Sequence, residues 1–222
     1  MSRRNTLVVV LLIAAATLAA VLIMTNGRSL AGEPAQISDS DAYWWWDRAT
    51  PVGSTRLVRN SSGLTAVYDA ADLPAGQALT LWFIIFNSPE NCATSPCSIP
   101  QDVFNPDAAA DFYFGAGHVV GGSGNTSFGG RLQVGDLTGS GKAETGLADP
   151  VALTNPYGAE VVLALHSHGP ALTGQALQDQ ISSYLGGCVV FNGPDGFAAG
   201  PEDVPDAVGE CSTITYSLHQ SN

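Results

Sequence analysis

The stretch "ALTLWFIIFN", residues 78–87, decides the fold class because it is apolar on both sets of alternating positions. Successive side chains of a β-strand point to opposite faces of the sheet. A strand with one buried face alternates apolar and polar residues, whereas this stretch carries large apolar residues on both faces. The sequence therefore predicts a central strand that is covered on its two sides.

Seven further segments of strand character accompany this central strand, and most are bounded by Gly, Pro, Asn or Ser. They span residues 54–60, 63–70, 111–121, 126–136, 158–168, 188–191 and 212–219. The first two are separated by "SSG" and the next two by a stretch containing "GSGN", so each pair is predicted to form a hairpin. Short strands at this spacing predict an all-β fold, an antiparallel immunoglobulin-like or Greek-key sandwich.

One segment, "TGQALQDQISSYLGGC" at residues 173–188, has helical rather than strand periodicity. Its apolar residues recur at i, i+4, i+7 and i+8 from Leu177, which places them on one face of a helix. Thr173 is a candidate N-cap, and two consecutive glycines mark the end. The sequence therefore predicts one short helix over about residues 174–185.

The N-terminus has the features of an export signal. Arg3 and Arg4 precede an uncharged run from Leu7 to Met24, and residues 29–31, "SLA", are a small-x-small cleavage site. The run is long for the core of a signal peptide and only just long enough to cross a bilayer. Two interpretations of residues 1–31 stay open: a signal peptide that is cleaved, or a membrane anchor that is retained through residues 7–24. Either alternative predicts a hydrophobic helix and places the rest of the chain outside the cytoplasm, secreted or tethered.

The rest of the chain divides into two parts. Residues 32–53 begin with small polar residues, "GEPAQISDSDA", and continue into an aromatic cluster, and we expect them to form a linker. Residues 54–222 are long enough to bury one core, so we expect a single β-sandwich domain. In the full chain, 20 acidic residues outnumber 8 basic ones and give a net charge of −12. Such a surface repels phosphate backbones, so nucleic acid is not an expected partner.

The cysteines indicate disulfide bonds. The chain has four, Cys92, Cys97, Cys188 and Cys211. An even number in an exported chain is typical of disulfides formed in an oxidising compartment. We expect Cys92 to pair with Cys97 and Cys188 to pair with Cys211, although three pairings are compatible with the sequence. A four-thiolate zinc site would need two close cysteine pairs, and this chain has one.

Two of the four histidines, His166 and His168, lie in "ALHSHGPALTG", residues 164–174. Residues i and i+2 of a strand share a face, so the two imidazoles are placed to bind one metal ion. His118 and His219 are the remaining imidazole ligands. A blue-copper centre is excluded because both methionines lie in the N-terminal segment and the cysteines are expected to be oxidised. Three interpretations stay open: histidine-ligated copper or zinc, structural histidines that bind no cofactor, or histidines that recognise a partner.

The aromatic cluster in the expected linker consists of Trp44, Trp45 and Trp46, next to Tyr43. Consecutive side chains of an extended segment cannot all face one way, so at least one ring is expected to be exposed or covered by a neighbouring loop. The cluster is a candidate binding patch for a sugar or a membrane surface. The alternative is that the rings fill one end of the β core.

The motif "LHSHGPA", residues 165–171, resembles the His-x-His-Gly-Pro-Ala signature of the CHRD (chordin-type) domain, a β module found outside the cell. "SGLTAVYDAADLPAG", residues 62–76, is similar to the early strands and turn of that family. The resemblance spans roughly residues 55 to 175, and the chain departs from the family in the cysteine-bearing segment 88–110 and in the helix after the motif.

This resemblance implies an immunoglobulin-like sandwich with no established catalytic activity. It also implies that His166 and His168 belong to a structural or binding motif. We therefore expect an exported, non-catalytic binding or structural module whose partner is an extracellular protein or another surface ligand.

The alternative function is a metalloprotein that resembles Cu/Zn superoxide dismutase. That Greek-key fold also holds copper partly through a His-x-His pair. In this chain His118 precedes the pair, and four histidines are too few for a two-metal site, so a copper-only site would need all of them. The acidic net charge would also repel superoxide unless arginines such as Arg131 compensate.

Overall fold

The chain forms strands joined by short helices in a computed structural model, which describes residues 33–191 and 205–221. The strands are β1 (Gln36–Trp44), β2 (Pro51–Asn60), β3 (Gly63–Ala70), β4 (Gln77–Phe86), β5 (Ala110–Val119), β6 (Thr126–Gln133), β7 (Glu160–Pro170), β8 (Val190–Phe191) and β9 (Glu210–His219). The helices are the 3-10 turns η1 (Pro89–Asn91) and η2 (Pro106–Ala108) and the α-helices α2 (Ile99–Asp102), α3 (Gly141–Thr145) and α4 (Gln175–Gln180). No helix in the described ranges is long and apolar enough to cross a membrane. The hydrophobic helix and cleavage site expected within residues 1–31 lie outside those ranges.

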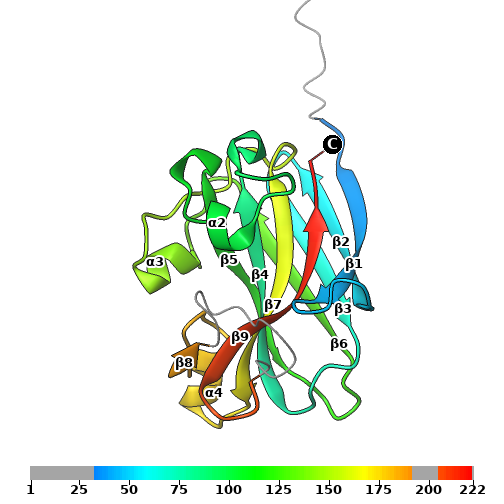
Figure 1. Cartoon of the computed structure of the whole chain (residues 1–222), viewed down its shortest axis with the longest axis vertical. Helices are drawn as coiled ribbons and strands as arrows, with labels where there is room; N and C mark the ends of the chain where they lie inside the picture. The colour runs from blue at the N-terminus through cyan, green and yellow to red at the C-terminus, as the bar shows by residue number, and fades with distance from the viewer. Residues whose placement is uncertain (1–32, 192–204, 222) are drawn as a thin grey trace, which may run out of the picture. The chain divides into compact units, whose positions relative to one another are not determined.

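Eight of the strands form one antiparallel sheet in the order β5-β4-β7-β9-β1-β2-β3-β6 (Figure 1). β8 lies off this path and pairs with β9 in parallel. The sheet curls so that β5-β4-β7-β9 packs against β1-β2-β3-β6, and a short pairing of β1 with β9 joins the two halves. The predicted all-β antiparallel sandwich is confirmed, and it is nearly closed into a barrel.

The two edge strands of the sheet, β5 and β6, approach each other without pairing. A Cβ atom added at Gly130 on β6 would lie 3.1 Å from the Cα atom of Gly115 on β5. The hairpin predicted between residues 111–121 and 126–136 is therefore wrong, because β5 pairs with β4 and β6 pairs with β3. The other predicted hairpin is confirmed as the pairing of β2 with β3.

The central strand predicted from "ALTLWFIIFN" is β4, and its ten residues are all buried. Leu79 and Phe83 on one face pack inside the sandwich. Trp82 and Phe86 on the other face belong to a second apolar cluster, together with Ile99 from α2. The sequence is apolar on both faces because both faces of this strand are covered.

Segment 88–110 forms the cover over the outer face of β4 and β7 (Figure 1). Its fold depends on buried carboxylates. Asp102 accepts hydrogen bonds from the backbone nitrogens of Ala93 and Ser98 at 2.8 and 2.7 Å. Glu160 on β7 accepts one from the backbone nitrogen of Cys97 at 2.7 Å. These bonds fix the cysteine-bearing loop to the sheet.

The structure corrects the expected linker at residues 32–53. Residues 36–44 of this segment form β1, which pairs with β2 along its length and with β9 at Tyr43 and Trp44. Up to Asp41 its side chains are exposed or half-buried, so the strand carries small polar residues rather than an alternating apolar pattern. The compact unit accordingly begins at Ala35 instead of residue 54.

The helix predicted over residues 174–185 is shorter than expected. α4 ends at Gln180, and its N-cap residue is Gly174 rather than Thr173. After it, the hydroxyls of Ser182 and Ser183 donate to the carbonyls of Gln178 and Asp179. Serine side chains that bond to nearby backbone in this way compete with the helical hydrogen-bond pattern.

Candidate functional site

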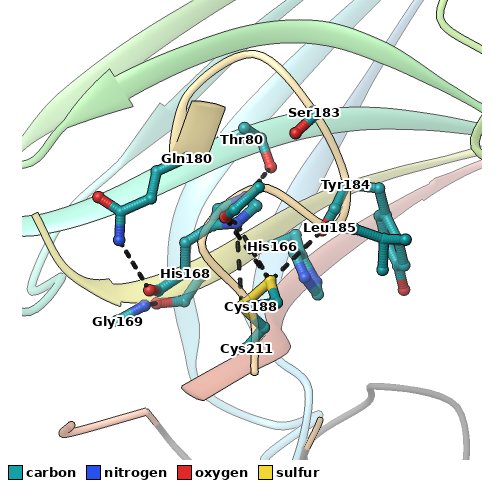
Figure 2. The surroundings of a disulfide bond; sticks show 12 residues. Thr80, His166, His168, Gly169, Gln180, Ser183, Tyr184, Leu185, Cys188 and Cys211 are labelled. Carbon is teal, nitrogen blue, oxygen red and sulfur yellow. Dashed lines mark hydrogen bonds between the residues drawn. A yellow bond between two sulfur atoms is a disulfide. The ribbon is translucent and has the colours of Figure 1, made fainter. Parts of the chain in front are cut away.

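His166 and His168 lie on the outer face of β7, as their spacing predicts (Figure 2). His166 is opposite Thr80 of β4 and Thr213 of β9 in the sheet register. Both imidazoles are buried, and their ring centroids are 5.0 Å apart with the planes nearly perpendicular. The strand therefore brings the two rings to one place, beneath the chain segment that follows α4.

The hydrogen bonds of His168 define its tautomer. Nδ1 lies 2.9 Å from the carbonyl oxygen of Gly186, which can only accept, so Nδ1 carries the proton. Nε2 lies 2.9 Å from Oγ1 of Thr80 and accepts from that hydroxyl. The same Oγ1 accepts from Nε1 of Trp82 at 2.8 Å. Burial lowers the pKa of His168 to about 4, so the ring is neutral at pH 7.

His166 is held mainly by packing. Its ring stacks on Tyr184 with centroids 4.4 Å apart and an interplanar angle of 22°. Burial, and secondarily the neighbouring His168, lowers the pKa of His166 well below its ordinary value. Both histidines of the pair are therefore neutral imidazoles, which is the form that binds metals.

A disulfide lies against this histidine pair. The two predicted pairings are both present, Cys92 with Cys97 and Cys188 with Cys211. The Sγ atoms of Cys188 and Cys211 lie 3.5 and 3.9 Å from Nδ1 of His168 (Figure 2). Two disulfides are typical of proteins from oxidising, extracytoplasmic compartments.

Two residues that sequence reasoning missed hold the cover over the histidines. The buried side chain of Gln180 donates from Nε2 to the carbonyls of His168 and Pro170 at 3.1 and 3.2 Å, and its Oε1 accepts from the nitrogen of Leu172. Glu144 of α3 accepts from the backbone nitrogens of Tyr184 and Leu185. A polar residue in a turn-rich segment carries no sequence signal of such burial.

The structure does not bring the other two histidines to this pair. His118 lies on β5 opposite Leu79 of β4. It is exposed, and its ring contacts Phe128 on the side of the inner core. His219 is opposite Val161, five residues from His166 along β7, which is roughly 16 Å at the rise of a strand. Its ring nitrogens bond to Ser38 and Thr55. A site that uses all four imidazoles is incompatible with this register.

The three tryptophans divide between the two faces of the chain, as consecutive residues of an extended segment must. Trp44 and Trp46 stack on each other at 4.8 Å and pack against the inner core. Trp45 faces the other way and contacts Tyr216 edge-on, with centroids 5.4 Å apart. The guanidinium of Arg48 lies 5.7 Å from the Trp45 ring and 5.6 Å from the Tyr216 ring.

Trp45 lines an open groove of about 540 Å³ on the outer face of β1 and β9. The rings of Tyr43, Trp45 and Tyr216 form one wall, and residues 94–101 of the disulfide loop form the other. Hydroxyl and amide side chains border the groove at Ser40, Thr94, Ser95, Ser98 and Gln101. We call this feature the aromatic groove.

The charge of the aromatic groove contrasts with that of the whole chain. Arg48 is its one formally charged lining residue, and Arg48 makes no ion pair within the described ranges. The described lining residues include no carboxylate and no imidazole. The groove therefore offers a cation and aromatic faces in a chain whose net charge is −12.

No family model, no curated protein and no solved structure matches this chain.

Proposed function

We propose that this chain is an exported, non-catalytic β-sandwich module that binds a carboxylate-bearing saccharide in the aromatic groove. The observation that carries the proposal is the convergence of three aromatic rings and the Arg48 guanidinium on one groove, edged by hydroxyl and amide groups. Ligand sites commonly combine apolar and aromatic walls with a few polar groups that fix orientation.

The groove chemistry favours this class of ligand. Tyrosine and tryptophan offer a flat apolar face for the C–H groups of a sugar ring and a polar edge for its hydroxyls. The Arg48 guanidinium presents donors in a planar fork that fits a carboxylate. The disulfide and the bonds to Asp102 and Glu160 hold the opposite wall in place before binding, which lowers the entropy lost on association.

A non-catalytic role is supported by what lines the groove. Hydrolysis of a glycosidic bond ordinarily uses a pair of carboxyl groups on either side of that bond. The described lining residues supply none, and they include none of the buried histidines: His166 and His168 lie beneath the segment after α4, and His219 bonds to Ser38 and Thr55. The resemblance to CHRD domains is a further argument for a binding module outside the cell.

The alternative function, a superoxide dismutase-like metalloprotein, lacks geometric support as a four-histidine site. His118 and His219 lie away from His166 and His168, so two imidazoles are the most that one ion would meet. The described part of the chain therefore favours binding in the groove over copper chemistry at this pair.

The proposal is tested by measuring binding of polygalacturonate, with neutral dextran as the uncharged comparison. Trp45→Ala should weaken polygalacturonate binding about tenfold, since the loss of an aromatic contact costs ~1.4 kcal/mol. Trp45→Phe, which keeps a ring, should retain most of the affinity. Arg48→Gln should weaken polygalacturonate binding, whereas Arg131→Gln, another exposed arginine, is the matched control.

Two results would contradict the proposal. If the native chain binds neither polymer, the saccharide is the wrong ligand class. If it binds dextran as tightly as polygalacturonate, and Arg48→Gln has no effect, the carboxylate requirement is wrong. Affinity electrophoresis or titration calorimetry distinguishes these cases.

A further inference from the structure

Four residues of metal-binding types, two histidines and two cysteines, meet at one place away from the aromatic groove. They are His166 and His168 from β7, Cys188 from the loop before β8, and Cys211 from β9. One donor atom from each lies within 4.8 Å of the other three. Ligands of a tetrahedral zinc ion, with Zn–S of about 2.3 Å and Zn–N of about 2.0–2.1 Å, are separated from one another by roughly 3.3–3.8 Å. The cluster is close to that size, and the S–S bond is what prevents the two sulfurs from acting as ligands.

We propose that this cluster is a redox-controlled zinc site: reduction of the Cys188–Cys211 disulfide creates a Cys₂His₂ site that binds one Zn²⁺, and disulfide formation expels the ion. The set of two thiolates and two imidazoles is one that zinc prefers in closed, tetrahedral sites. All four side chains are already positioned by the sheet and its cover, so binding requires separation of two sulfurs rather than assembly of the site.

The reductant that the proposal requires is a dithiol. Its thiolate attacks Sγ of Cys188, which is half-buried, whereas Cys211 is fully buried. A mixed disulfide forms with Cys188, and Cys211 leaves as a thiolate. The second thiol of the reductant then displaces Cys188, so two electrons pass to the cysteine pair and the reductant becomes a disulfide. Zinc binding by the two thiolates releases any thiol protons to solvent.

The contacts of His168 suit a zinc ligand with one change of tautomer. Its Nδ1 is the nitrogen that faces the sulfurs, at 3.5 and 3.9 Å. Coordination through Nδ1 replaces its bond to Gly186 and moves the ring proton to Nε2. Thr80 Oγ1 lies 2.9 Å from Nε2 and can accept that proton's hydrogen bond. Zinc-binding histidines commonly donate their second N–H to such a partner.

The other disulfide provides a matched comparison. Cys92 and Cys97 lie near Asp102, which makes a group of three potential ligands. The two Asp102 oxygens already accept backbone N–H groups at 2.8 and 2.7 Å, and the group contains no imidazole. Reduction of this pair is therefore not expected to create a closed zinc site.

The test measures zinc bound by the chain before and after reduction with a phosphine, which does not compete as a thiol ligand. The reduced Cys92→Ala/Cys97→Ala chain should bind about one Zn²⁺ per molecule. The reduced Cys188→Ala/Cys211→Ala chain and the oxidised native chain should bind none. Cobalt(II) in place of zinc should show the visible spectrum of a tetrahedral thiolate complex.

Three outcomes would overturn the proposal. The first is that the reduced Cys92→Ala/Cys97→Ala chain binds no zinc although it keeps its β-sheet circular dichroism. The second is that the reduced Cys188→Ala/Cys211→Ala chain binds as much zinc as that variant. The third is that the oxidised native chain does so. A measurement on the reduced native chain avoids variants that fail to fold. Zinc should protect Cys188 and Cys211 from alkylation but not Cys92 or Cys97, and equal alkylation of all four with and without zinc would also contradict the site.

Discussion

At the scale of single residues, His168 and His219 are buried imidazoles whose ring nitrogens have polar partners. His168 bonds to Gly186 and Thr80, and His219 bonds to Ser38 and Thr55. Burial is the main cause that lowers the pKa of each ring from its ordinary value of 6.5 to about 4. A consequence of these low pKa values is that stability depends on pH.

The free energy of unfolding should fall as pH drops from about 6.5 to about 4. In this window the unfolded chain binds protons at His168 and His219 that the folded chain does not bind. The stabilisation that these two neutral histidines contribute is complete above the pKa that they have in the unfolded chain. It is lost as the pH falls toward their pKa in the folded chain. A shift of this size corresponds to ~3 kcal/mol per fully buried histidine. Urea unfolding at a series of pH values measures the slope.

Variants of single histidines isolate this effect from other titrating groups. Burial raises the pKa of Glu160, so that residue contributes a slope of opposite sign. His219→Gln should therefore flatten the pH dependence relative to the native chain, and His118→Gln, at an exposed histidine, is the matched control. A His219→Gln chain whose stability changes with pH as steeply as that of the native chain would contradict the assignment.

At the scale of elements, the two disulfides fasten different kinds of segment. Cys92–Cys97 joins residues five apart within one loop, whereas Cys188–Cys211 joins residues 23 apart and fastens the cover of the histidine pair to β9. A cross-link that closes a longer loop restricts the unfolded chain more. The second bond should therefore contribute more to stability.

Removal of each disulfide tests this ranking in an oxidised chain. Cys188→Ala/Cys211→Ala should lower the free energy of unfolding by about 3.5 kcal/mol and Cys92→Ala/Cys97→Ala by about 2 kcal/mol, from the loop-entropy relation. Urea unfolding of the two double variants gives the values. The reverse order would mean that contacts of the loop at residues 92–97 outweigh the loop entropy.

At the scale of the whole molecule, the sandwich is nearly closed because glycines allow its edges to approach. A Cβ atom at Gly130 of β6 would lie 2.7 Å from the Phe83 ring and 3.1 Å from the Cα atom of Gly115. At Gly129, one position earlier on the same strand, an added Cβ meets no atom within 4 Å. The close approach of β5 and β6 therefore depends on the missing side chain at Gly130 but not on the one at Gly129.

Alanine substitutions at these two glycines test the closure. Gly130→Ala should destabilise the chain by ~1–3 kcal/mol, the usual cost of an added group in a packed interior. Gly129→Ala should be neutral or stabilise by up to ~1 kcal/mol, because it restricts the unfolded chain without a clash. Thermal unfolding compares the two, and equal effects would show that β5 and β6 are not in contact at Gly130.

The residue patterns predicted where the strands lie in the sequence better than they predicted which strands pair. "ALTLWFIIFN" predicted a strand covered on both faces, and β4 is that strand. The turn at "GSGN" predicted a hairpin, but the strands on either side of it pair with β4 and β3 instead. Glycine and asparagine indicate where the chain turns, whereas the pairing of strands depends on which apolar faces meet across the core.

The candidate sites were predictable to different degrees. The His166–His168 pair follows from the period of a strand, and the alternation of Trp44, Trp45 and Trp46 follows from the same rule. The proximity of Cys188 and Cys211 to His168 does not, because it depends on how the cover after α4 packs on β7. The position of Arg48 over Trp45 likewise needs the turn after β1.

The sequence by itself determined the fold class, the burial of residues 78–87, and the shared face of His166 and His168. These properties depend on local periodicity and on spacing along the chain. Only the tertiary structure decided that β1 belongs to the sheet, that β5 and β6 form its unpaired edges, and that two imidazoles and a disulfide share one site. Those properties arise from contacts between residues far apart in sequence, and a local sequence pattern does not show which distant residues will come into contact.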